Sequence, residues 1–67
     1  MAILKVIEVL AESDKSWEDA ASKAVHEASE TVENIRSVYI KELQASVENN
    51  NIKKYRVNAK ISFEIRH

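Results

Sequence analysis

Residues 55–66 read Y-R-V-N-A-K-I-S-F-E-I-R, and this stretch decides the fold. Apolar and polar side chains alternate strictly along it. Because successive side chains of a β-strand point to opposite faces of a sheet, the alternation predicts a strand with one face in the core. The other face meets water, a partner or a ligand. The residues of the expected core face are Tyr55, Val57, Ala59, Ile61, Phe63 and Ile65.

Residues 3–10, near the start of the chain, form a second strand candidate. They read I-L-K-V-I-E-V-L, a β-branched run in which only Lys5 and Glu8 are polar. Such a continuous apolar run predicts a strand that is buried on most of both faces.

Residues 37–48 predict the remaining strand. Their apolar positions change parity near Lys41 and Glu42, which predicts a bulge or a strong bend. Asn49–Asn51 follow and supply a turn to the last strand, since asparagine tolerates positive φ where glycine is missing.

Residues 17–35 have the spacing of an amphipathic helix, with apolar side chains at steps of three and four. Ser16 is expected to cap its start by accepting a hydrogen bond from the backbone near Asp19. Asn34 is expected to end it. The apolar stripe consists of Trp17, Ala20, Ala21, Ala24, Val25, Ala28, Val32 and Ile35.

The order strand, helix, strand, strand restricts the topology. A right-handed crossover leaves the first two strands parallel, and a hairpin makes the third antiparallel to the second. Placing the third strand between the others gives the order 1-3-2 with antiparallel neighbours. The sequence therefore predicts an α+β fold, a β-α-β-β unit with a three-stranded antiparallel sheet packed on one helix, as a single domain over residues 1–67.

The size of the chain predicts self-association. A chain of 67 residues buries only about 60% of the surface that its unfolded form exposes. The absence of cysteine excludes disulfides and thiolate zinc sites as extra stabilisation. A helix of roughly nineteen residues spans about 28 Å, whereas strands of roughly twelve residues span about 40 Å. One helix cannot cover such a sheet, so a homo-oligomer is expected.

Composition excludes several classes of function. The 10 basic and 11 acidic residues form no basic stripe, so a nucleic-acid partner is not expected. The chain contains no long apolar run, so a membrane span is not expected. The start of the chain lacks a signal-peptide pattern, so a cytoplasmic location is expected. The absence of glycine excludes glycine-rich phosphate loops.

Four segments together resemble the dodecin family, in order, in spacing and in total length. They are Lys5–Val9, Ser16–Ala20, Thr31–Ile35 and Tyr55–Phe63. Dodecins are β-α-β-β proteins that assemble as hollow shells of twelve subunits, and many store riboflavin or its phosphate (FMN) between aromatic side chains. The resemblance implies a non-enzymatic, homododecameric shell that binds, stores or buffers a small ligand.

The resemblance also identifies two positions of the flavin site. Ser37 stands where flavin-binding members carry a stacking tryptophan, and Arg56 stands where they carry a glutamine. Serine has no π face for stacking, and arginine donates hydrogen bonds but does not accept them. Both changes resemble the calcium-dodecin branch, so the resemblance argues against a flavin cofactor and makes calcium an alternative ligand. Arg56 can also hold a carboxylate or phosphate through its planar guanidinium.

His26, Glu30 and Glu33 are the candidate metal ligands. On a continuous helix their i, i+4, i+7 spacing places them on one face. With a symmetry mate they can supply ligands to a divalent cation, and calcium favours several oxygen ligands. The alternative is that they are solubilising surface charges. Further oxygen donors are Glu12, Asp14 and Asn49–Asn51.

Two alternatives to a ligand-binding shell are a hydrolytic enzyme and a structural or interaction module. His26 has Ser22 and Ser29 one turn away on either side, but a serine–histidine pair needs an orienting acid and an oxyanion hole to act as a nucleophile. No catalytic residue is therefore expected. Trp17 shares the apolar stripe, which favours core or interface packing. The other alternative is a structural module whose exposed sheet edge binds a partner peptide.

Overall fold

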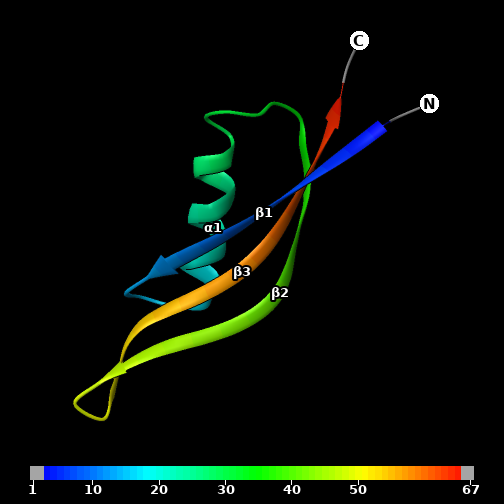
Figure 1. Cartoon of the computed structure of the whole chain (residues 1–67). Helices are drawn as coiled ribbons and strands as arrows, with labels where there is room; N and C mark the ends of the chain where they lie inside the picture. Colours follow the sequence, from blue (N-terminus) through cyan, green and yellow to red (C-terminus); the bar gives the residue numbers. More distant parts are fainter. Residues whose placement is uncertain (1–2, 66–67) are drawn as a thin grey trace.

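The computed structural model describes residues 3–65 and contains three strands and one helix (Figure 1). These are β1 (Ile3–Ser13), α1 (Trp17–Ala28), β2 (Ile35–Glu48) and β3 (Asn51–Ile65). β3 lies between β1 and β2 and is antiparallel to both. The predicted β-α-β-β layout and the strand order 1-3-2 are confirmed. Arg66, at the end of the alternating stretch, lies outside the described residues.

α1 packs on one face of the sheet against the odd-numbered residues of β3. The side chains that α1 buries against the sheet are all alanines. Ser16 caps the helix as predicted, and its Oγ accepts a 2.9 Å hydrogen bond from the backbone N–H of Asp19. The buried hydrophobic residues are Ala20, Ala24, Ala28, Val57, Ala59 and Ile61.

The prediction that the helix continues to Asn34 is wrong, because α1 ends at Ala28. The Ser29 hydroxyl donates to the carbonyl of His26 (2.6 Å), and the Thr31 hydroxyl donates to the carbonyl of Ala28 (3.3 Å). Side chains that bond nearby backbone carbonyls in this way compete with continued helix. Asn34 has a positive φ of 61°, but it precedes β2 and does not cap α1.

The strands are longer than predicted. β2 already begins at Ile35, and β3 already begins at Asn51. The predicted irregularity in β2 is confirmed as a register shift between Ile40 and Glu42. The turn between β2 and β3 is also confirmed, with positive φ at Asn49 (53°) and Asn50 (66°).

The prediction that β1 is buried on most of both faces is wrong for the single chain. Ile7, Val9 and Ala11 pack against the core next to α1. The alternate side chains point to the face that α1 does not cover, and there Leu4, Val6 and Leu10 are 55%, 55% and 62% exposed.

The chain is elongated, with extents of 51 × 19 × 13 Å. Its radius of gyration is 13.7 Å, whereas a compact chain of this length has about 11 Å. Its accessible surface is 5068 Å², against about 4,300 Å² for a typical monomer of this mass. The single helix therefore leaves much of the sheet uncovered, as the lengths predicted.

Candidate functional site

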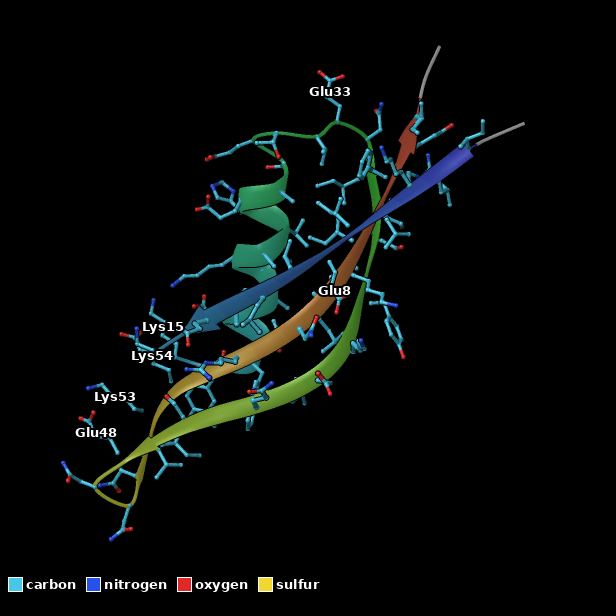
Figure 2. All side chains as sticks on the ribbon, viewed as in Figure 1. Glu8, Lys15, Glu33, Glu48, Lys53 and Lys54 are labelled. Atoms are coloured by element: carbon cyan, nitrogen blue, oxygen red, sulfur yellow. The ribbon has the colours of Figure 1, made fainter. Side chains whose placement is uncertain are left out.

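Both flavin-site positions lie on the face of the sheet opposite α1, which we call the open face. Its central row consists of the even-numbered residues of β3: Arg56, Asn58, Lys60, Ser62 and Glu64. β1 flanks this row on one side and β2 on the other. Figure 2 shows Glu8, on β1, near the middle of the sheet.

Ser37 lies opposite Ser62 on the open face. The two hydroxyls form a hydrogen bond with each other. Their side chains thus give this part of the face a small, polar surface. Nothing in this pair offers an aromatic plane on which an isoalloxazine ring can stack.

Arg56 is held by its own chain. Its Nε donates to the carboxylate of Glu12, its cross-strand neighbour on β1. The hydrogen bond from Arg56 lowers the pKa of the Glu12 carboxyl, partial desolvation opposes this effect, and the charges of Arg56 and Lys54 add to the lowering. The guanidinium of Arg56 is therefore already partly committed to a carboxylate.

We expect Arg56→Gln to raise the pKa of Glu12 toward its ordinary value. Because the folded-state pKa is lowered, the interaction stabilises the fold at pH values above the ordinary carboxyl pKa. Its contribution is lost as the pH falls through the lowered value. A side-chain NMR titration of Glu12 in both proteins checks this. An unchanged titration would show that the Arg56 bond is not formed in solution.

Ser37 and Arg56 do not meet within one chain. Ser37 pairs with Ser62, whereas Arg56 pairs with Gln44. Ser62 and Arg56 are six positions apart on β3, which corresponds to about 20 Å along the strand. A compact site built from both positions therefore requires a second copy of the chain.

Asn58, between these two positions, was not identified from the sequence. Its Oδ1 is buried and has no hydrogen-bond partner among the residues that the structure describes. Its cross-strand neighbours are Leu10 on β1 and Glu42 on β2. No sequence signal identifies this residue, because the strict alternation groups Asn58 with the solvated positions.

The three candidate metal ligands are not brought together on one helix face. His26 lies in the last turn of α1, but Glu30 and Glu33 lie beyond its end in the connection to β2. Glu33 stands in the loop at the end of the molecule away from the hairpin (Figure 2). Within residues 3–65, no group of three or more histidine, aspartate or glutamate side chains is placed to hold a metal ion.

Two of the other oxygen sources considered in the sequence, Glu12 and the Asn49–Asn51 turn, are engaged locally. Glu12 pairs with Arg56, and the carbonyl of Asn49 accepts from the side chain of Asn51 at 3.2 Å.

The Ser29 hydroxyl donates a hydrogen bond to the backbone carbonyl of His26. Ser29 thus contributes to the end of the helix and not to a serine–histidine pair.

Trp17 is a packing residue, as predicted. Its indole Nε1 donates a 2.6 Å hydrogen bond to the carbonyl of Gln44 on β2. Its ring meets Tyr55 edge-on, with centroids 4.9 Å apart and an interplanar angle of 77°. These two contacts tie the start of α1 to β2 and β3.

In the described part of the chain, no helix has the length and apolarity needed to cross a bilayer.

Comparisons with known proteins agree with this fold. The chain is 35% identical over 66 residues to calcium dodecin from Mycobacterium tuberculosis (strain ATCC 25618 / H37Rv), a match that covers 98% of this chain and 93% of that protein. The crystal structure of that organism's calcium dodecin, described as calcium chelating with a novel calcium-binding site, matches with a TM-score of 0.83 and 34% identity. This match covers 96% of this chain and 91% of the other.

A second solved structure shows the fold at lower identity. The tt0972 protein from Thermus thermophilus has a TM-score of 0.94 and 21% identity, and the match covers 100% of this chain and 98% of the other. A family model described as Dodecin matches residues 3–66. The chain belongs to the dodecin family.

Proposed function

We propose that this chain assembles into a hollow homododecamer that binds a small ligand and catalyses no reaction. The observation that carries the proposal is the row of exposed apolar side chains on the open face, Leu4, Val6 and Leu10. A chain with so small a core gains stability by burying such a row against other copies. Family membership supports the number of subunits.

The native mass tests the assembly. Twelve chains of 7.6 kDa give about 91 kDa. Light scattering on the purified protein should give this mass over a wide range of concentrations. A monomer or a dimer would contradict the proposal.

We propose a divalent cation, calcium in the first place, as the ligand of the shell. The near full-length similarity to a calcium dodecin supports this, as does serine at position 37. His26, Glu30 and Glu33 from neighbouring copies are the proposed ligands. All three side chains are exposed, so they are available to a neighbouring copy.

Calcium is expected to raise the melting temperature of the assembled protein, because a ligand that binds only the folded state stabilises it. A double variant, Glu30→Gln with Glu33→Gln, should lose this shift. Glu18→Gln, a matched change on the first turn of α1, should keep it. Calorimetry without heat and without a thermal shift would contradict calcium binding. A shift that survives in the double variant would place the site elsewhere.

Flavin binding is expected to appear only when an aromatic side chain is restored at position 37. The wild-type protein should leave riboflavin fluorescence unchanged at micromolar concentration, because Ser37 and Ser62 present only hydroxyls there. Ser37→Trp combined with Arg56→Gln should quench it, since each aromatic contact adds about 0.5–1.5 kcal/mol. Quenching by the wild-type protein would overturn the flavin-free assignment.

A further inference from the structure

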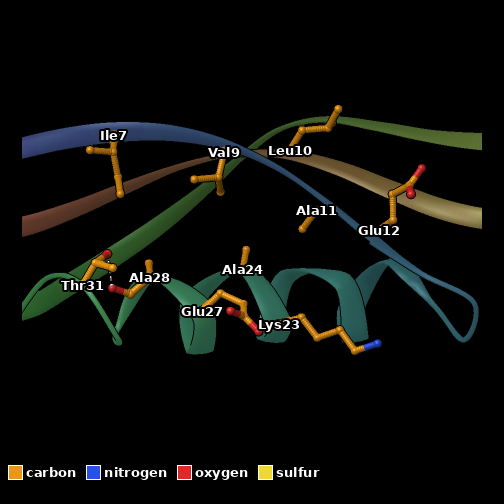
Figure 3. A pocket seen from close by; sticks show the side chains of 10 residues that line it. All are labelled: Ile7, Val9, Leu10, Ala11, Glu12, Lys23, Ala24, Glu27, Ala28 and Thr31. Carbon is orange, nitrogen blue, oxygen red and sulfur yellow. Dashed lines mark hydrogen bonds between the residues drawn. The ribbon is translucent and has the colours of Figure 1, made fainter.

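α1 and β1 enclose an apolar groove that nothing in the described chain fills. Its volume is about 490 Å³, and Figure 3 shows its lining side chains. Ile7, Val9 and Ala11 line it from β1, and Ala24 and Ala28 line it from α1. One water takes about 30 Å³ of liquid volume, so the groove is many times larger than a single water. It has room for several side chains. An apolar groove of this size is a poor environment for water.

Beyond the end of β1, the β2–β3 hairpin projects from the sheet and carries two exposed apolar side chains, Val47 and Ile52 (Figure 1). We define residues 46–54 as the hairpin end. β1 pairs with β3 only from Tyr55 onward, so Asn51–Lys54 pair with β2 alone. A ribbon of two strands is marginally stable in water unless it packs against something. Val47 and Ile52 face each other across this ribbon and are 65% and 52% exposed.

The hairpin end cannot fill the groove of its own chain. The groove residues Ile7 and Ala11 are level with Ile61 and Val57 of β3. Ile52 is five to nine residues from these positions, which is about 15–30 Å along the strand. Figure 1 shows the hairpin pointing away from α1. A hairpin end that fills this groove must therefore belong to another copy of the chain.

The charges beside the two surfaces are complementary. On the rim of the groove, Lys23 pairs with Asp19 at 3.5 Å, whereas Glu27 forms no ion pair with any residue that the structure describes. On the hairpin end, Lys53 pairs with Glu48 at 2.9 Å, and the neighbouring Lys54, whose charge also acts on Glu12 at the end of β1, adds a further positive charge. A free carboxylate thus faces outward at the groove and an excess positive charge lies at the hairpin.

We propose that the hairpin end of one copy docks in the α1–β1 groove of the next, with Val47 and Ile52 inserted between helix and strand. The two surfaces are different patches of the same chain, so the contact is head-to-tail. Such contacts close into rings when the rotation per copy allows it. The inference rests on the proposed shell and names one of the contacts that build it.

Cysteine cross-linking tests the contact, and the chain contains no native cysteine. One preparation carries Glu27→Cys and the other, with a size tag, carries Lys53→Cys. After mixing, co-refolding and mild oxidation, a disulfide-linked pair of one tagged and one untagged chain is expected. The matched control replaces Glu27→Cys with Ser22→Cys, an exposed position on α1 outside the groove. Equal cross-linking with both positions, or none with either, would overturn the docking.

Dye binding, which reports whether the groove is filled or empty, gives a second test. The dye 1-anilinonaphthalene-8-sulfonate should bind weakly to the wild-type assembly and several times more strongly to Ile52→Asp, because the charged side chain leaves the groove empty. Equally strong binding to the wild-type assembly would show an open groove and overturn the docking. A native mass near 91 kDa without the cross-link would refute the docking while the shell stands. A monomeric wild-type protein would refute both.

Discussion

Replacing Ile61 with alanine is expected to lower the free energy of unfolding by about 2–5 kcal/mol. Ile61 is fully buried and is one of the two largest side chains in the core. It packs between α1 and the strands, in contact with a cluster that includes Ala24 and Ala28. Since those neighbours are alanines on a fixed helix, they cannot fill the cavity that the substitution leaves. A loss of this size is a large fraction of the stability of a small domain.

Urea unfolding at one fixed subunit concentration measures the effect, because the apparent stability of an assembly depends on that concentration. The fluorescence of Trp17, the single tryptophan, reports the loss of its contact with Tyr55. Ile61→Val is the graded control and should cost about 0.5–1.5 kcal/mol. Equal losses for the two variants would mean that the site collapses around the smaller side chain, contrary to this packing.

The alternating stretch at residues 55–65 predicted the central strand because every second side chain meets the helix. Strand order followed from handedness and from a hairpin without glycine, in which Asn49 and Asn50 adopt positive φ. The helix end was not predictable from spacing. Val32 and Ile35 do pack against the core, so they continue the apolar period, but they reach the core from the connection and from β2. The periodicity of the sequence therefore shows which side chains are buried, but it does not show whether a helix, a connection or a strand carries them.

For the candidate site, the sequence predicted two positions but not the partners of their side chains. The resemblance placed Ser37 and Arg56 at ligand positions, and both lie on the open face. The bond between Arg56 and Glu12 joins residues 44 positions apart. No local pattern gives such a pair, because it depends on the register of β1 against β3. The same register puts Asn58 between its neighbours and buries its Oδ1.

The burial predicted for β1 differs from the structure in an informative way. Its sequence has the continuous apolar run of a strand that is covered on both faces, yet one face of the single chain is uncovered. Both observations hold if other copies of the chain cover the open face. The apolar run of β1 then reflects burial in the assembly, whereas the exposed side chains reflect the surface of a single subunit.

Val6→Glu is therefore expected to break the assembly. Val6 stands between Leu4 and Leu10 in the exposed row of β1. Fully burying a valine side chain is worth about 1.5–3 kcal/mol, and Val6, which is 55% exposed in the single chain, has about half of this left to gain. An unpaired charge in its place adds a large desolvation cost. Every subunit carries the substitution, so the effect is repeated at each copy of the contact. Light scattering should show the mass falling from about 91 kDa toward 7.6 kDa.

Glu8→Gln is the matched control for this variant. Glu8 lies next to Val6 on the same face of β1, but it is polar and pairs with Lys41 across the sheet at 3.5 Å. Exposed ion pairs contribute about 0–1 kcal/mol, so Glu8→Gln should leave the native mass unchanged. If Val6→Glu keeps the full mass, the open face is not where the copies meet. Dissociation of both variants would instead assign the contact to the charges of this face and not to its apolar row.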